Sequence, residues 1–208
     1  MVNGVDYSLY LVTDREMSRG KDLCEIVVEA IRGGVTIVQL REKKLPLDEF
    51  IKVASEIKAV VKPYKIPLII NDRIEVAIAV GADGVHIGQG DTPLDTARKS
   101  VGPKMIIGVS VSNVEEAIAA QNGGADYLGI SPVWNTPTKT DTPEATGLEG
   151  VRAIRAAVKI PLVGIGGINA SNARAVIEAG CEGIAVVSAI MAAENPRDAA
   201  IELRNAIE

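Results

Sequence analysis

The chain has 208 residues, 47% of them apolar, and a formal net charge of −5. This length suits one domain with a large core, and α/β barrels of this size occur as single domains. An acidic chain without a run of Lys or Arg excludes a typical nucleic-acid binder, although a few cations gathered in one pocket can still hold a phosphate.

The cysteine usage and the apolar pattern favour a cytoplasmic protein. Cys24 and Cys181 lie far apart, each in a hydrophobic context, so we expect small buried thiols rather than a disulfide framework. The alternative of a catalytic thiol has no supporting motif. The first residues, MVNGVDYSLYLVTD, lack a secretion signature, and no apolar run approaches the ~20 residues of a membrane span.

Eight short apolar runs alternate with segments of helical spacing. The runs predict strands at Tyr10–Val12, Ile37–Leu40, Leu68–Ile70, Gly84–Ile87, Ile106–Val109, Tyr127–Ile130, Leu162–Ile165 and Gly183–Val187. Segments such as LCEIVVEAIRGG and LDEFIKVASEIKAVV predict the helices between them. Strands that alternate with helices indicate a parallel sheet, and eight such units predict an α/β fold, a single (β/α)8 TIM barrel over residues 1–208. An open doubly wound sheet is the alternative.

Polar residues follow each predicted strand, at the end where the active site of such a barrel lies. They include Thr13, Asp14, Arg41, Glu42, Lys43, Asn71, Asp72, Gln89, Asp91, Ser110, Ser112 and Ser188. Taken singly, Asp72, Asp91 and Ser188 are typical of helix N-caps. Taken together with the cations of the second unit, they favour a functional site.

Two parts of this face are expected to bind phosphate groups. Gly166–Gly167 and Ser188 follow the seventh and eighth strands, where such barrels often bind a phosphate through backbone N–H groups. Asp72 and Asp91 stand on adjacent units beside Arg41 and Lys43. Because Mg²⁺ is typically held by one or two carboxylates plus substrate phosphates, this second corner suits a diphosphate.

Residues 131–146 form a loop far longer than the usual connection of about 2–6 residues. It contains the stretch SPVWNTPTKTD. The sequence leaves the role of Trp134 open: anchoring the loop on the barrel rim is one interpretation, and a catalytic role is not expected. The only histidine, His86, lies inside the fourth predicted strand. We interpret it as a packed, hydrogen-bonded core residue in preference to a general base.

In this order the motifs resemble the thiamine phosphate synthase family. The resemblance runs over nearly the whole chain, through YLVTD, QLREK, PLIIND, GVHIGQGD, IGVSV, SPVWNTPTK, GIGGI and VVSAI. It implies a barrel enzyme that joins a hydroxymethylpyrimidine diphosphate to a thiazole phosphate with Mg²⁺ as cofactor. It also implies a dissociative mechanism, in which pyrophosphate leaves before the thiazole nitrogen attacks the pyrimidine cation.

The resemblance implies a role for individual residues. The pyrimidine diphosphate would be bound by Gln39, Leu40, Arg41, Glu42, Lys43, Asn71, Ser110 and Lys139. The thiazole phosphate would be bound by Thr136, Pro137, Thr138, Gly167, Val187 and Ser188. Asp72 and Asp91 would hold Mg²⁺, and Lys139, Arg41 and Ser110 would be catalytic. The long loop would then reach both substrates across the barrel mouth.

Three other functions stand as alternatives. Thiazole tautomerases share the barrel and are expected to carry a histidine shortly after the fifth strand, where this chain has Ser112 and Asn113. A sugar-phosphate isomerase or epimerase would use only the monophosphate corner. A non-catalytic barrel would bind thiamine precursors without turnover. We expect small-molecule substrates, with no nucleic acid and no membrane as partner, and the sequence leaves open whether the chain forms a homo-oligomer.

Overall fold

A computed structural model describes residues 4–135 and 144–208 of the chain. Within these ranges eight parallel strands form a closed barrel in chain order, and the last strand pairs with the first. The strands are β1 (Leu9–Val12), β2 (Ile37–Leu40), β3 (Leu68–Asn71), β4 (Gly84–Ile87), β5 (Ile106–Val111), β6 (Tyr127–Ile130), β7 (Leu162–Ile165) and β8 (Gly183–Val186). The predicted (β/α)8 barrel is confirmed.

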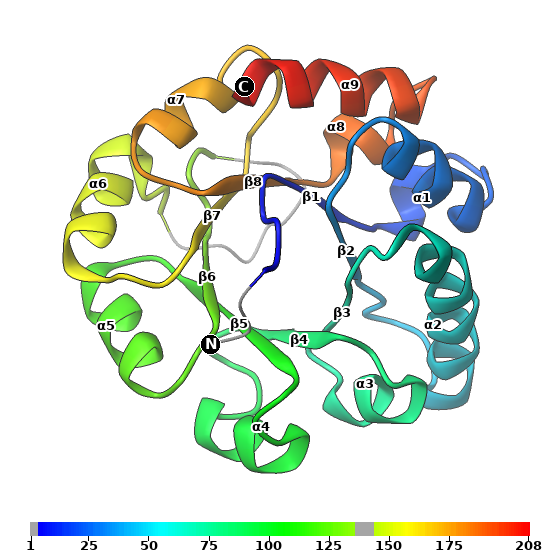
Figure 1. Cartoon of the computed structure of the whole chain (residues 1–208), viewed down its shortest axis with the longest axis horizontal. Helices are drawn as coiled ribbons and strands as arrows, with labels where there is room; N and C mark the ends of the chain where they lie inside the picture. Colours follow the sequence, from blue (N-terminus) through cyan, green and yellow to red (C-terminus); the bar gives the residue numbers. More distant parts are fainter. Residues whose placement is uncertain (1–3, 136–143) are drawn as a thin grey trace.

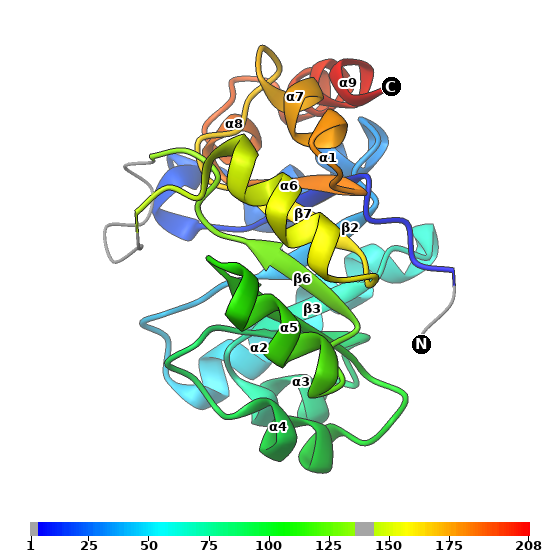
Figure 2. The same cartoon turned by 90° about the vertical axis from the view of Figure 1, so that its left-hand side faces the viewer.

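Helices form an outer ring around the strands, as Figures 1 and 2 show from two directions. In the described ranges they are α1 (Leu23–Arg32), α2 (Leu47–Val61), α3 (Ile74–Val80), α4 (Leu94–Val101), α5 (Val114–Asn122), α6 (Gly147–Ala157), α7 (Ala173–Glu178), α8 (Ser188–Met191) and α9 (Pro196–Ile207), with 3-10 turns η1 (Arg15–Ser18) and η2 (Lys62–Tyr64). None of these helices is long and apolar enough to cross a membrane.

Two strands continue further than their apolar runs predict. β5 extends to Val111 because Ser110 and Val111 stay paired with β6. β3 includes Asn71, which pairs with His86 of β4. Asn71 and Ser110 are therefore held by the sheet itself. Side chains of a strand alternate between its two faces, and the positions of Asn71 and Ser110 are those that point toward the barrel axis.

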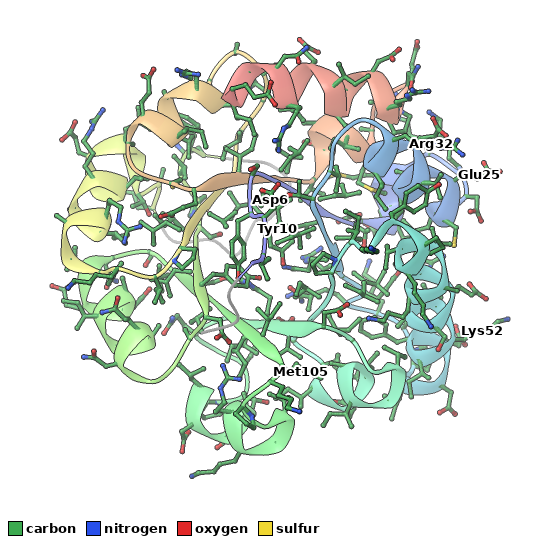
Figure 3. The ribbon with its side chains drawn as sticks, in the orientation of Figure 1. Asp6, Tyr10, Glu25, Arg32, Lys52 and Met105 are labelled. Atoms are coloured by element: carbon green, nitrogen blue, oxygen red, sulfur yellow. The ribbon has the colours of Figure 1, made fainter. Side chains whose placement is uncertain are left out.

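The apolar core has two layers. Inside the barrel, side chains such as Tyr10, Ile37 and Tyr127 pack together, and Tyr10 lies near the centre of the ring in Figure 3. A larger layer lies between the strands and the helices, and Val38 and Leu40 belong to it. Neighbouring residues of β2 therefore face opposite layers, as the two-residue period of a strand requires.

Both cysteines are free thiols. Cys181 is buried, and desolvation raises the pKa of its thiol to about 12. Cys24 is half-buried on α1, and its pKa is raised as well, chiefly by desolvation. A reactive cysteine has a lowered pKa, so neither thiol has the character of a nucleophile.

Candidate active site

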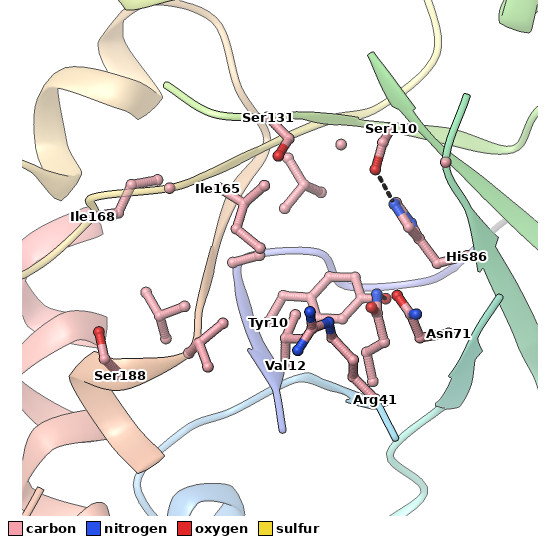
Figure 4. Close-up of a pocket in the computed structure, with 18 of the residues that line it drawn as sticks. Tyr10, Val12, Arg41, Asn71, His86, Ser110, Ser131, Ile165, Ile168 and Ser188 are labelled. Atoms are coloured by element: carbon pink, nitrogen blue, oxygen red, sulfur yellow. Dashed lines mark hydrogen bonds between the residues drawn. The ribbon is translucent and has the colours of Figure 1, made fainter. Parts of the chain in front are cut away.

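A cavity of about 370 Å³ opens at the carboxyl ends of the strands (Figure 4). Its lining includes residues from each of the eight strands or the loops that follow them. Among the residues singled out in the sequence, the cavity brings together Gln39, Arg41, Lys43, Asn71, Asp72, Asp91, Ser110, Gly167, Val187 and Ser188. In Figure 4 Arg41, Asn71 and Ser110 lie toward one side of the cavity, and Ser188 lies across from them.

Two residues of the expected pyrimidine site do not line the cavity. Leu40 is fully buried in the layer between strands and helices. The Glu42 carboxylate accepts a hydrogen bond of 2.8 Å from Arg15 on the outer side of the β2 end. Both residues occupy alternate positions whose side chains point away from the barrel axis. The two-residue period of β2 could therefore have excluded them from the predicted site. Thr136, Pro137, Thr138 and Lys139 lie outside the described residues.

The guanidinium of Arg41 is held in place at the edge of the cavity. Its Nη1 donates to Asp14 Oδ2 at 3.2 Å, and its backbone N–H donates to Thr13 Oγ1 at 3.1 Å. Asp14 is itself fixed, because its other oxygen accepts from the backbone N–H of Glu16 at 3.0 Å. The Arg41 side chain remains 22% exposed. A guanidinium oriented in this way can offer its remaining donors to an anion in the cavity.

Asp72 and Asp91 do not cap the helices that follow them. The N-cap residues of α3 and α4 are Arg73 and Pro93, and neither helix has a side-chain cap. Asp72 has a φ of 61°, a left-handed conformation that non-glycine residues adopt rarely and that often marks a functional site. The backbone N–H of Gly88 donates to Asp91 Oδ2 at 2.7 Å, which orients that carboxylate.

The two carboxyl groups lie close enough to perturb each other. The pKa of Asp72 is raised to about 6, first by burial and then by the hydrogen bond and the charge of Asp91. Lys43, whose Nζ is 3.7 Å from Asp72 Oδ2, acts in the opposite direction but does not cancel these effects. Paired carboxylates with incomplete charge compensation fit a divalent cation. No group of three or more His, Cys, Asp or Glu side chains that could hold a metal ion occurs in the described ranges.

His86 belongs to the cavity as well as to the core. Its Nδ1 lies 2.8 Å from the Tyr127 hydroxyl, and its Nε2 lies 2.9 Å from Ser110 Oγ. The expected hydrogen-bonded packing is therefore present, but the ring also lines the cavity beside Tyr10 and Tyr127. The sequence reasoning missed the two tyrosines. The signal that could have found them is their position on inward-facing sites of β1 and β6.

On the other side of the cavity, the loop after β7 supports the start of the long loop. Val133 donates its backbone N–H to Ile165 O at 2.8 Å, and Trp134 donates to Gly166 O at 3.2 Å. Gly166 and Gly167 have φ of 101° and 67°, and a Cβ atom on Gly167 would lie 2.9 Å from Cβ of Trp134. Both positions therefore require glycine. The Trp134 side chain is partly buried against the apolar core between the strands and the helices.

Comparison with known proteins identifies this arrangement. The family described as thiamine monophosphate synthase matches residues 9–190. A thiamine-phosphate synthase of Clostridium acetobutylicum is 52% identical over 96% of this chain and 94% of its own length. One of Syntrophomonas wolfei is 50% identical over 98% of this chain and 97% of its own. A solved thiamine phosphate pyrophosphorylase of Pyrococcus furiosus is 42% identical, with a TM-score of 0.89 over 98% of this chain and 96% of that one. This chain therefore belongs to the thiamine monophosphate synthase family.

Proposed function

We propose that this chain joins hydroxymethylpyrimidine diphosphate to thiazole phosphate and releases thiamine phosphate and pyrophosphate. The reaction class comes from the relatives, which are thiamine-phosphate synthases over nearly their whole length. The observation that carries the proposal is the pair Asp72 and Asp91 beside Arg41 and Lys43, at one side of a cavity that extends to Ser188. Two phosphorylated substrates that must meet need two such anion corners.

The pyrimidine diphosphate is assigned to the side of Arg41. The guanidinium, oriented by Asp14, and the Lys43 ammonium supply positive charge there. Asn71 and Ser110 point into the same part of the cavity from β3 and β5. Gln39 lies deeper, 5% exposed, and is suited to contact the pyrimidine ring rather than the phosphates. Lys139, outside the described residues, keeps its assignment to the diphosphate as a proposal from the sequence.

Mg²⁺ is the proposed cofactor, and Asp72 and Asp91 are its proposed ligands. The pair fits the ion because both carboxyl groups face the cavity and neither caps a helix. When bound, the ion neutralises charge on the diphosphate. The protein's own contribution is to hold the two carboxylates in place, Asp91 through the Gly88 N–H and Asp72 through its left-handed backbone.

The thiazole phosphate is assigned to the opposite side of the cavity. Gly167, Val187 and Ser188 line it, and the glycine brings backbone close to any anion there. Thr136, Pro137 and Thr138 keep the roles that the family resemblance implies. This assignment puts the two substrates on opposite walls of one cavity.

The proposed reaction is dissociative. The bond between the pyrimidine methylene carbon and the diphosphate oxygen breaks, and its electron pair leaves with pyrophosphate. The lone pair of the thiazole nitrogen then forms the new carbon–nitrogen bond. Arg41 and Ser110 stabilise charge on the leaving group more in the transition state than in the ground state, which is the condition for acceleration. Apolar walls such as Val163 and Ile165 exclude the water that would quench the cation.

The alternatives gain no support from the site. After β5, where a thiazole tautomerase would need a histidine, the backbone N–H of Ser112 donates to Glu116 and Asn113 caps α5. A sugar-phosphate isomerase or epimerase would use the monophosphate corner and would have no need of a diphosphate corner. A cytoplasmic location is retained as a proposal, because two free thiols suit a reducing compartment. Homo-oligomer formation likewise stays a prediction.

Release of pyrophosphate tests the proposed function. The purified protein is incubated with both precursors and Mg²⁺, and each component is omitted in turn. We expect pyrophosphate and thiamine phosphate in equal amounts only from the complete mixture. Pyrophosphate without thiazole phosphate at the same rate would indicate a diphosphatase. Binding of both precursors without any product would indicate the non-catalytic barrel, and undiminished activity in excess chelator would remove Mg²⁺ from the proposal.

A further inference from the structure

A continuous line of hydrogen-bonding side chains crosses the floor of the cavity. Gln39 Nε2 donates to the Tyr10 hydroxyl at 2.9 Å, which lies 2.8 Å from the Tyr127 hydroxyl. The Tyr127 hydroxyl lies 2.8 Å from His86 Nδ1, and His86 Nε2 lies 2.9 Å from Ser110 Oγ, the bond drawn in Figure 4. The five residues come from five different strands, and we refer to them together as the floor chain.

The barrel is shaped to hold the floor chain. Tyr10 and Tyr127 are each only 1% exposed, so their hydroxyls depend on partners within the protein. A Cβ atom on Gly108 would lie 2.1 Å from Tyr127 Cζ, and one on Gly129 would lie 3.0 Å from His86 Cε1. Glycines on β5 and β6 therefore make the space for the two rings, which leaves them little freedom to move.

The floor chain can run in only two directions, because each hydroxyl has one hydrogen to donate. With the Gln39 amide donating to Tyr10, the Tyr10 hydrogen is available for Tyr127, and the Tyr127 hydrogen is available for His86 Nδ1. Burial raises the pKa of both tyrosines above the ordinary value, so both phenols retain that hydrogen. Rotating the Gln39 amide by half a turn would reverse every bond in turn.

The direction of these hydrogen bonds determines whether the Ser110 hydroxyl can donate a hydrogen bond to a group in the cavity. A neutral imidazole that accepts at Nδ1 carries its proton on Nε2 and donates it to Ser110 Oγ. Ser110 then keeps its own hydroxyl hydrogen for a group in the cavity. In the reverse direction that hydrogen would be used on His86 Nε2, and Ser110 would present only lone pairs. Lone pairs repel a diphosphate, whereas an O–H donor binds it.

We propose that the floor chain runs from Gln39 to Ser110, which holds the His86 ring as the Nε2–H tautomer and makes Ser110 a hydrogen-bond donor to the leaving diphosphate. Tyr10, Tyr127 and His86 are then positioning residues that act through Ser110. The part concerning the diphosphate rests on the proposed function, whereas the tautomer of His86 does not.

The tautomer can be measured directly, because His86 is the only histidine of the chain. Protein labelled with ¹⁵N-histidine gives one pair of ring nitrogen signals, whose shifts and couplings to the ring protons identify the protonated nitrogen. We expect the Nε2–H form without ligands at about pH 8, above the ordinary imidazole pKa of about 6.5. A proton on Nδ1 would overturn the proposal.

Two variants test the direction and one is a control. Tyr127→Phe removes the donor to Nδ1 and should give a mixture of tautomers or the Nδ1–H form. Tyr10→Phe removes the link to Gln39 and should change the tautomer population of His86 in the same direction but to a smaller extent. Tyr7→Phe removes the hydroxyl of a tyrosine whose ring lies 5.0 Å from that of Tyr127 but is not part of the floor chain, and it should leave the signals unchanged. Tautomers unaffected by both Tyr127→Phe and Tyr10→Phe would refute the proposal.

Kinetics then tests whether the floor chain acts through Ser110. Tyr127→Phe should lower kcat roughly 5–10-fold, the effect of one neutral hydrogen bond, and should leave KM for thiazole phosphate within about twofold. In a Ser110→Ala background the same substitution should have almost no further effect on kcat. Additive losses would show that Tyr127 acts independently of Ser110. If the protein proves to have another activity, the tautomer measurement still decides the direction of the floor chain.

Discussion

Replacing Asp72 by Asn should make the protein more stable and less active. Asp72 carries a φ of 61°, and Asn is among the residues that tolerate this conformation best. The amide of Asn keeps a donor that can bond to Asp91, as a protonated Asp72 would. The substitution therefore removes one negative charge from the pair without adding backbone strain.

The magnitude follows from the pKa of Asp72. A rise from 3.8 to about 6 sets an upper limit of roughly 3 kcal/mol on the unfavourable free energy of the ionised carboxyl in the folded state, and because Asp72 is partly exposed and shares the effect with Asp91, we expect about 1–2 kcal/mol of it to appear as stability. The sign is that of a carboxyl whose pKa is higher when folded, so the penalty grows between about pH 4 and pH 6 and is complete above that range. For a chain of this size, Asp72→Asn should raise Tm by about 2–8 °C at neutral pH without metal.

Thermal unfolding in chelator measures the predicted gain in stability, and thermal unfolding at rising Mg²⁺ concentration measures the predicted loss of metal binding. In chelator the variant should melt above the parent at about pH 7.5, and the difference should disappear near pH 4. Mg²⁺ should raise the Tm of the parent by binding the folded state, and should raise that of the variant much less. The Mg²⁺ concentration for half-maximal rate should increase in the variant.

A matched control distinguishes the effect of changing the Asp72–Asp91 pair from the effect of removing any one negative charge. Asp95 on α4 is exposed and pairs with Lys99 at 3.3 Å, so Asp95→Asn also removes one carboxylate but leaves the cavity intact. Exposed pairs contribute little, and Tm should change little. If Asp72→Asn melts below the parent in chelator, the argument from burial of the charge and its repulsion by Asp91 is wrong. If both proteins respond to Mg²⁺ alike, Asp72 is not a ligand.

Three further predictions concern other parts of the molecule. Gly108→Ala should destabilise the fold by about 1–3 kcal/mol, because the new methyl group would overlap the Tyr127 ring. Gly90→Ala, with open space around the new methyl group, should not destabilise it, and chemical denaturation compares the two variants. Lys139→Ala should lower kcat by about 10²–10³ with Tm nearly unchanged, and a loss below about threefold in steady-state kinetics would end that assignment. Cys181→Ala should leave kcat unchanged, since burial keeps its thiol protonated; loss of turnover in a folded variant would revive the catalytic thiol.

The sequence by itself determined the barrel, because the information is local. Each apolar run is short enough to be a strand, each is followed by helical spacing, and neighbouring units must pair in order to bury both faces. Eight repeats of that pattern predict the strands, and each predicted end lies within about two residues of the observed one. The same local pattern predicts which polar residues gather at the carboxyl ends, since Arg41, Lys43 and Ser110 follow or end their apolar runs.

Only the tertiary structure decided how those residues meet. Tyr10 and Tyr127 are 117 positions apart, and no local pattern indicates that their hydroxyls touch. The left-handed backbone of Asp72 and its closeness to Asp91 depend equally on how β3 and β4 lie side by side. The periodicity of the sequence predicts which face of a strand a side chain occupies. A hydrogen bond across the barrel depends, in addition, on the closure of the sheet. Distances across the ring are set when the last strand pairs with the first, and that closure is a property of all eight strands together.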